Sequence, residues 1–369
     1  MPRVESLDDF VALLERSHLL SDENRLDLWD AANGLKSARE LAEWLIKQRW
    51  LTKWQAAQLL DGHEQLHIGG YRLLELIGRG GMGLVFKAEQ MTTQQIVVLK
   101  VMSQLGNIKG IRRYVQEVRA ASVLTHSHIV TTLDAGVADG CHFIVMDYLP
   151  GSDLNAIILS QSPLPVSWSC EVARQVAAGL QHAHEQGLVH RDIKPSNVLI
   201  TPEPDFLTPH ARILDFGLAR IVSESVSIRD VTHTGAVLGT PDYISPEQAM
   251  SAKHADIRSD IFSLGCTLFQ MITGTFPFPG RNVMEKLMAR ITTTPPSVSA
   301  LRAEAHTELD GLVASLLCCN PNDRPQTPGE VADELARLSL KIRRHESRIE
   351  RLHPAKLEPQ SASRTPLAR

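Results

Sequence analysis

The sequence predicts an α+β fold in which a small helical module precedes a domain of two lobes, one built on an antiparallel sheet and one mainly helical. The 369-residue chain is too long for one ordinary core and suits a large domain plus a smaller unit. Helix-capping signals fill residues 1–69, short β-rich runs begin at Tyr71, and helical patterns return after Pro150. These changes place the first lobe at 70–149 and the second at 150–340.

Residues 1–69 carry start and stop signals for three or four short helices. The start signals pair a Ser or Thr with an acidic or amide residue three positions later, namely Ser6 with Asp9, Ser37 with Glu40 and Thr52 with Gln55. The stop signals are Asn33-Gly34 and Asp61-Gly62. Four of the five tryptophans lie here, and we expect them to form the module's core rather than a ligand cage, because small domains depend on buried aromatic area.

The first lobe is predicted from short runs of β-forming residues at 72–77, 85–88, 96–102 and 141–148. A helix is expected to interrupt these runs over about 109–124. Pro150 and Gly151 then predict the hinge to the helical lobe.

The C-terminal segment 341–369 reads as an extension of the domain. Its first part, 341–352, is rich in charged residues and predicts a solvated continuation of the last helix. The remainder, 354–369, is polar with Pro, Ser and Lys, and we expect it to be disordered.

Charge, cysteine content and hydropathy indicate which partners and which compartment to expect. The net charge of −4 and the pI near 6.4 give no field favouring nucleic acid. The five cysteines are odd in number and scattered, which indicates a reducing compartment rather than a disulfide framework. No secretory signal or membrane-spanning run is visible, so we expect a cytoplasmic protein.

A glycine-rich loop lies between two predicted strands. Gly78, Gly80 and Gly83 have the G-x-G-x-x-G spacing that dinucleotide-binding folds also use. Here the loop joins a hairpin instead of opening a helix, and about twenty positions on stands Lys100 rather than an acidic residue that would bind ribose. The loop therefore favours phosphate binding by exposed backbone N–H groups in a different fold.

Six motifs follow one another in a fixed order. They are Gly78-Arg79-Gly80-Gly81-Met82-Gly83-Leu84-Val85, Val97-Val98-Leu99-Lys100, Glu117, His190-Arg191-Asp192-Ile193-Lys194-Pro195-Ser196-Asn197, Asp215-Phe216-Gly217 and Ser245-Pro246-Glu247. The set resembles the signature of the eukaryotic-like serine/threonine protein kinases of bacteria, over about residues 70–340. The resemblance implies the two-lobed protein kinase fold, with ATP and Mg²⁺ as cofactors.

The resemblance also implies catalytic roles. Asp192 would accept or orient the proton of the substrate hydroxyl, and Lys194 would neutralise the γ-phosphoryl. Lys100, paired with Glu117, would hold the α- and β-phosphates. The implied ligands of Mg²⁺ are Asn197 and Asp215.

The nucleotide pocket carries over by position from the same family. Its implied members are Ile77, Gly78, Gly80, Gly83, Val85, Val98, Lys100, Met146, Asp147, Leu149, Asp153 and Leu199. Met146 matches the residue at the back of the pocket, and Asp153 matches the acidic residue that binds ribose. Val98 departs from the family, which usually has Ala there, and should narrow the pocket.

Regulation is expected in the long polar segment between Asp215 and Glu247. Thr232 and Thr234 stand where related bacterial kinases carry regulatory threonines, and Arg191 would pair with their phosphates. By the same resemblance, Glu247 should pair with Arg324, and Asp260 should support the catalytic loop.

The histidines of this chain offer a competing hypothesis. His126, His128, His182, His184 and His190 could be read as zinc ligands. They coincide with structural motifs of kinases and have no cysteine pair nearby, so we expect structural roles.

The sequence thus predicts a kinase that transfers the γ-phosphoryl of MgATP to Ser/Thr hydroxyls of proteins, including its own activation loop through self-association. One alternative is a pseudokinase scaffold that binds partners through the kinase fold and the helical module. The intact Lys100, Asp192, Asn197 and Asp215 argue against that alternative. In a further alternative, the main function lies in residues 1–69 as an interaction module, and the kinase activity is only the output of its binding.

Overall fold

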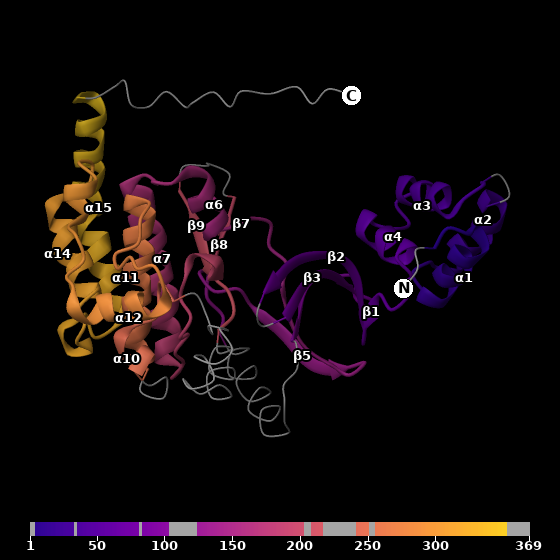
Figure 1. The fold of residues 1–369 in the computed structure, drawn as a ribbon, viewed down its shortest axis with the longest axis horizontal. Coiled ribbons are helices and arrows are strands. Elements are labelled where there is room, and N and C mark those ends of the chain that lie inside the picture. Colours follow the sequence, from indigo (N-terminus) through magenta and orange to yellow (C-terminus); the bar gives the residue numbers. More distant parts are fainter. Residues whose placement is uncertain are drawn as a thin grey trace. The chain divides into compact units, whose positions relative to one another are not determined.

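The structure is a computed structural model that describes residues 4–32, 35–80, 83–102, 124–202, 208–216, 241–250 and 255–352. The chain divides into two compact units (Figure 1). The first, here the sheet unit, comprises Met1–Thr125 and Val130–Leu149. The second, the helical unit, comprises His126–Ile129 and Pro150–Arg369.

The N-terminal module folds into the short helices that its capping signals predict. They are α1 (Leu7–Ser17), α2 (Asp22–Ala32), α3 (Ala38–Lys47) and α4 (Lys53–Leu60). Ser6 and Ser37 accept hydrogen bonds from the amides of Asp9 and Glu40, and Thr52 with Gln55 forms a complete capping box. The stop at Asp61 is also present, whereas Asn33-Gly34 lies outside the described residues.

Leucine side chains and Phe10, rather than Trp44, Trp50 and Trp54, fill the centre of the module. Phe10, Leu41, Leu45 and Leu59 are fully buried there. Trp44, Trp50 and Trp54 pack against this core but stay partly exposed. These three tryptophans therefore contribute to the hydrophobic core as expected, but they lie at its margin rather than at its centre.

The sheet unit continues from the module into a six-stranded antiparallel sheet that curls on itself (Figure 1). Its strands are β1 (His67–Ile68), β2 (Tyr71–Gly80), β3 (Gly83–Gln90), β4 (Ile96–Met102), β5 (Thr132–Ala138) and β6 (Cys141–Asp147). They lie in the order β1-β2-β3-β4-β6-β5. All four predicted strands are present, and β1 and β5 are additions that the sequence did not predict. The expected helix at 109–124 falls, except for Leu124, outside the described residues.

The helical unit carries a small three-stranded sheet beside its helices. The strands are β7 (Ser152–Asp153), β8 (Val198–Thr201) and β9 (His210–Ile213). The helices are α6 (Leu154–Gln161), α7 (Val166–Glu185), η1 (Pro195–Asn197), α10 (Pro246–Met250), α11 (Ile257–Thr273), α12 (Val283–Thr292), α13 (Val298–Leu301), α14 (Thr307–Leu316), η3 (Pro321–Asp323) and α15 (Pro328–Leu352). Within the described part of the chain, no helix has both the length and the apolar character needed to cross a bilayer.

The last helix, α15, continues through the charged segment as predicted, but that segment is not simply solvated. Ile342 is 1% exposed, and Glu346 is buried and accepts hydrogen bonds from the amides of Val166 (2.8 Å) and Ser167 (3.3 Å). Helix α7 begins at Val166 after Pro165, which supplies no side-chain cap. Glu346 therefore caps α7 from another helix, because its carboxylate satisfies amides that lack partners within α7.

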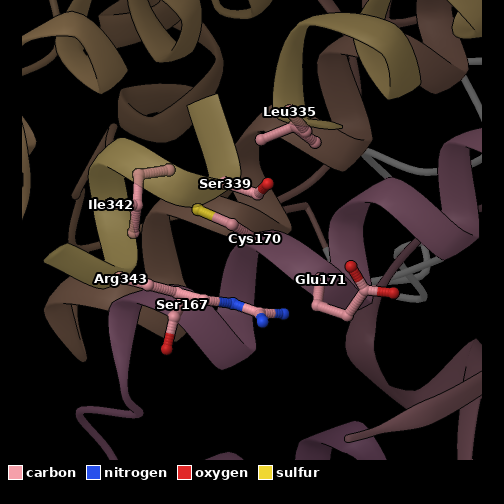
Figure 2. A pocket seen from close by; sticks show the side chains of 7 residues that line it. All are labelled: Ser167, Cys170, Glu171, Leu335, Ser339, Ile342 and Arg343. Carbon is pink, nitrogen blue, oxygen red and sulfur yellow. The ribbon is translucent and has the colours of Figure 1, made fainter. Parts of the chain in front are cut away.

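Figure 2 shows the contact between α15 and α7 at closer range, around a cavity of about 10 Å³. Ser339 and Ile342 of α15 face the buried Cys170 of α7. Burial raises the pKa of the Cys170 thiol, so the thiol stays protonated and behaves as a packing group. The C-terminal extension is thus part of the packed unit as far as Glu346.

Candidate active site

One face of the curled sheet gathers several of the predicted nucleotide residues. Val85 of β3 pairs with Gly78 of β2 on one side and with Lys100 of β4 on the other. Val98, two residues before Lys100, pairs with Met146 of β6. Because side chains alternate along a strand, Val85, Val98, Lys100 and Met146 share this face, which we call the nucleotide face.

The opposite face of these strands forms the core of the curled sheet. Leu73, Phe86, Val97, Leu99 and Val145 are buried there. Lys100 itself is only 6% exposed, which is unusual for an ammonium group without a function. Its predicted partner Glu117 lies outside the described residues.

The glycine-rich loop joins β2 to β3, which pair as far as Gly80 and Gly83. Gly83 has φ of +142°, and a Cβ there would lie 1.9 Å from the carbonyl oxygen of Val101. Only glycine fits this position, for a packing reason that its spacing did not reveal. Gly80 has open space where a Cβ would be, and Ile77 is 46% exposed, so both can contact a ligand.

Asp147 and Leu149 end the sheet unit. The N–H of Asp147 donates to the carbonyl oxygen of Thr131 at 3.1 Å. The backbone group of Asp147 that could contact adenine is therefore its carbonyl. Leu149 is half-buried at the last position of the unit.

The catalytic loop of the helical unit brings three predicted residues together. The Asp192 carboxylate accepts a hydrogen bond from Lys194 Nζ at 2.7 Å and from Asn197 Nδ2 at 3.0 Å. Asn197 Nδ2 also donates to the backbone carbonyl of Asp192 at 2.8 Å. Asp192 is 21% exposed and Lys194 15%, so the pair is accessible but fixed in position. A carboxylate held in this way can receive a proton from a hydroxyl beside a fixed positive charge.

Buried groups hold this loop from behind. Asp260, which is fully buried in α11, accepts the amide N–H groups of His190 and Arg191, both at 2.7 Å. Arg191 has φ of +67°, a strained value for this residue type that these bonds maintain. The sequence predicted Asp260 but missed Gln248, whose side-chain amide donates to the Arg191 carbonyl at 2.8 Å.

Asp153 and Leu199 are direct partners across β7 and β8. Asp153 also begins α6, since its Oδ1 accepts the amide of Ala156 at 2.9 Å. The residue predicted to bind ribose therefore has a structural role that the sequence did not show. Gly151 approaches β8 so closely that a Cβ would lie 2.3 Å from the carbonyl oxygen of Ile200.

The donor set predicted for Mg²⁺ fits a hard cation. Asn197 uses its amide nitrogen on Asp192, which leaves its carbonyl oxygen as the side-chain group for a cation. The amide of Leu214 donates to the Asn197 backbone carbonyl at 2.9 Å, which brings the segment before Asp215 alongside. An amide oxygen and a carboxylate are ligands that Mg²⁺ prefers.

The segment around Asp215 is fixed by its neighbours in the helical unit. Asp215 has φ of +62°, and Phe216 packs edge-on against the His190 ring with centroids 4.8 Å apart. His190 Nε2 in turn contacts the Leu214 carbonyl oxygen at 2.7 Å. His190 therefore has the structural role that we expected.

Three of the other histidines lie together, with the His126 ring stacked on His182 and edge-on to His128. His126 lies 5.1 Å from His182 and 5.4 Å from His128 between ring centroids, and His128 contacts the Ala211 carbonyl. Burial lowers the pKa of His128 to about 4 despite that contact. In the described ranges, no group of three His, Cys, Asp or Glu residues has the arrangement of a metal site.

The predicted regulatory threonines, Thr232 and Thr234, lie outside the described residues. Arg191 is described, and its guanidinium donates to the Ala255 carbonyl at 3.3 Å. The predicted pair of Glu247 with Arg324 is present, at 2.7 Å between Oε1 and Nη1.

Comparison with known proteins adds a family to this geometry. The sequence model of the protein kinase domain matches residues 71–335. Serine/threonine-protein kinase pkn3 of Myxococcus xanthus is 37% identical over 285 residues, which are 75% of this chain and 51% of that protein. Serine/threonine-protein kinase PknB of Mycobacterium leprae is 33% identical over 274 residues, 73% of this chain and 43% of that protein. This chain thus spans about half the length of these relatives, or less.

Solved structures agree with this relationship. The kinase domain of PknI from Mycobacterium tuberculosis matches with a TM-score of 0.58 and 28% identity, covering 73% of this chain and 97% of that domain. The family match covers most of the chain and all six motifs fall within it. The chain therefore belongs to the protein kinase family, as its motifs predicted, and serine/threonine kinases of bacteria are among its relatives.

Proposed function

We propose that the chain is a serine/threonine kinase that transfers the γ-phosphoryl of MgATP to protein hydroxyls. The observation that carries this proposal is the Asp192 carboxylate fixed between Lys194 and Asn197. A chain that only bound partners would not need this arrangement. Family membership supports the same activity.

Each part of the cluster has a chemical task. Asp192 orients the attacking hydroxyl and receives its proton, while Lys194 lies 2.7 Å away and can neutralise charge on the transferred group. Asn197 and Asp215 would hold Mg²⁺, which when bound neutralises phosphate charge. The protein forms no covalent bond itself, so positioning and electrostatics supply the rate.

The nucleotide is proposed to contact the residues that the family resemblance implies. From the sheet unit these are Ile77, Gly78, Gly80, Gly83, Val85, Val98, Lys100, Met146, Asp147 and Leu149. From the helical unit they are Asp153 and Leu199. The buried Lys100 on the nucleotide face supports this, because an ammonium group held in position there is suited to contact phosphates.

Regulation is proposed to run through phosphorylation of Thr232 or Thr234 by a second copy of the chain. Each phosphate would add about −1.5 to −2 charges and pair with Arg191. Glu117 would then meet Lys100 in the active state. The five free cysteines support a reducing compartment, which we propose is the cytoplasm.

The proposal is tested by incubating the full chain with MgATP and mapping phosphosites by mass spectrometry. Asp192→Ala and Lys100→Met should each lower the rate by about 10²- to 10⁴-fold, because each removes a group aimed at the reacting phosphate. Asp333→Ala, which changes an exposed carboxylate on α15, is the matched control and should retain full activity. Equal turnover in wild type and Asp192→Ala would refute the assignment. Nucleotide binding without phosphoryl transfer by the wild type would instead favour the pseudokinase scaffold.

A further inference from the structure

The N-terminal module contacts the sheet through the capping box that begins α4. Within the box, Thr52 Oγ1 accepts the Gln55 amide at 3.1 Å and Gln55 Oε1 accepts the Thr52 amide at 2.8 Å. Both side chains also carry a donor that the box does not use. The Thr52 hydroxyl donates to the Leu74 carbonyl at 2.6 Å, and Gln55 Nε2 donates to the Leu73 carbonyl at 2.7 Å. We call these two bonds the clamp.

The clamp acts on an irregular point of β2. The register between β2 and β3 shifts after Leu73, so that Leu73 pairs with Ala88 and Glu75 with Lys87. Leu74 is the extra residue of this bulge, and a bulge bends its strand and leaves backbone groups without ladder partners. The module donates hydrogen bonds to the carbonyls of Leu73 and Leu74 at this bulge. Gln55 is 3% exposed, so water cannot readily replace it.

The strand that the clamp holds leads directly into the glycine-rich loop. Gly78 follows Leu74 along β2, and the hairpin returns as β3. The module touches that strand too, because the Trp54 ring packs edge-on against Phe86 with centroids 5.7 Å apart. Phe86 follows Val85, whose side chain lies on the nucleotide face. The module therefore contacts both strands of the hairpin, and its Trp54 ring lies on the face opposite the nucleotide face.

A pocket and a second attachment lie beside the clamp. Beside the clamp, an open pocket of about 910 Å³ separates the module from the sheet, lined by Leu13, Arg16, Trp54, Leu73 and Phe86 among others. A further attachment lies at Arg72 of β2, which donates to the Leu19 carbonyl at 3.2 Å and pairs with Glu89 of β3. The clamp and the Arg72 bond are thus directed attachments between the module and the hairpin, beside the contact of Trp54 with Phe86.

From this geometry we propose that Thr52 and Gln55 are positioning residues for nucleotide binding, through which the N-terminal module sets the affinity of the kinase for ATP. The clamp fixes the bulge, the bulge fixes the direction of the β2–β3 hairpin, and the hairpin carries the loop that receives the phosphates. Small displacements of such a loop weaken its contacts with the ligand. The inference rests on the proposed function, because it assigns the loop to ATP.

The decisive variant is Gln55→Glu. Glutamate at this position keeps the oxygen that completes the capping box, but it lacks the donor and brings a carboxylate against the Leu73 carbonyl. We expect the Kd for MgADP to rise about threefold to tenfold, the size expected for one hydrogen bond. The KM for ATP should rise in parallel, whereas the KM for a protein substrate should not. Amide hydrogen exchange at residues 75–80 should become faster.

Three companion variants separate positioning from stability. Thr52→Ser keeps both bonds of its hydroxyl and should behave as the wild type. Trp54→Leu leaves the capping box intact and removes the ring contact with Phe86, so it should also raise the Kd. Ser37→Ala removes a helix cap of the same module away from the sheet, and should lower the melting temperature without changing the Kd.

The outcomes distinguish this inference from the proposed function. A wild-type chain that binds no MgADP would overturn the proposed function and, with it, this inference. Binding by the wild type that is unchanged in both Gln55→Glu and Trp54→Leu would overturn the inference alone. If Gln55→Glu fails to fold, the Kd for MgADP is compared between Trp54→Leu and Ser37→Ala instead. An equal rise in Kd in these two variants would overturn the inference, because the module would then act only by stabilising the fold.

Discussion

Glu247 and Arg324 form a bidentate ion pair inside the helical unit, with Oε1–Nη1 at 2.7 Å and Oε2–Nη2 at 2.9 Å. The Arg324 side chain is fully buried and also donates to the carbonyls of Cys318, Arg258 and Cys319. Burial alone would raise the pKa of Glu247, but the hydrogen bonds from Arg324 and Ser259 outweigh it and hold the pKa below its ordinary value. The pair is thus fully charged at neutral pH.

Glu247→Gln should lower the free energy of unfolding by about 3–5 kcal/mol, because it leaves the Arg324 charge buried without its partner. Urea denaturation measures this. Glu334→Gln is the matched control, since Glu334 pairs with Arg337 at the surface and should cost less than about 1 kcal/mol. Equal losses in the two variants would show that the buried pair has no special weight.

The catalytic loop should lose activity below about pH 6 through Asp260. Burial raises the pKa of Asp260 to about 6, although His190 and the two amides offset part of the effect. In a protonated carboxyl group one oxygen is a hydroxyl and a weaker acceptor, so one of the bonds from the His190 and Arg191 amides should weaken and the loop should loosen. The measurement is the pH dependence of kcat/KM between pH 5 and 8. Asp260→Asn should be less active and lack the inflection, and an unchanged inflection in that variant would exclude Asp260.

Stability should change in the opposite direction over the same range. The folded pKa of Asp260 lies above its ordinary value of 3.8, so this group's contribution to stability is fully present below pH 3.8 and is lost as pH rises through about 6. Wild type should therefore gain stability relative to Asp260→Asn on acidification from pH 7 to 5. Thermal melts at matched ionic strength test this. A difference between the two proteins that does not vary with pH would contradict it.

Glu346→Ala should destabilise the helical unit by about 1–3 kcal/mol, because the amides of Val166 and Ser167 would be left buried without acceptors. Thermal or urea unfolding provides the value. On the same helix, Ser347→Ala changes an exposed residue and should stay within about 0.5 kcal/mol of wild type. If both variants unfold like the wild type, the cap is energetically neutral.

Val98→Ala should widen the range of nucleotides accepted. Val98 lies on the nucleotide face between Lys87 and Met146, and excess bulk in a packed site costs about 1–3 kcal/mol. Competition binding should show that an N6-benzyl ATP analogue gains affinity relative to ATP. Val97→Ala, directed into the core at 1% exposure, should lower stability without this selectivity. If Val98→Ala binds the same range of inhibitors as the wild type, then valine in place of the usual alanine has no effect on the selectivity of the pocket.

The parts of the fold that the sequence predicted are those with strong local patterns. Strands β2, β3, β4 and β6 follow from runs of β-forming residues, and the helix starts of the module follow from capping pairs. Strand β5 was missed because Thr132–Ala138 contains Asp, Gly and Ala, and it exists through its pairing with β6. The strand propensity of a segment contains no information about pairing with another strand.

The same limit applies to single side chains. The spacing of Thr52 and Gln55 predicts a helix start, but it does not show where their second donors go. Glu346 appears in sequence as one charge among many, and its partner Val166 lies 180 positions away. The motif residues could be named because their spacing is local, whereas Gln248 and the clamp depend on tertiary placement.

The long last helix has a consequence for how the domain is delimited. The sequence model of the protein kinase domain matches as far as residue 335, yet Ile342 and Glu346 lie beyond that point and belong to the packed interior. A chain cut at residue 335 would be damaged at Val166, in a different helix. The end of the matched kinase domain therefore falls short of the packed interior, which reaches at least to Glu346.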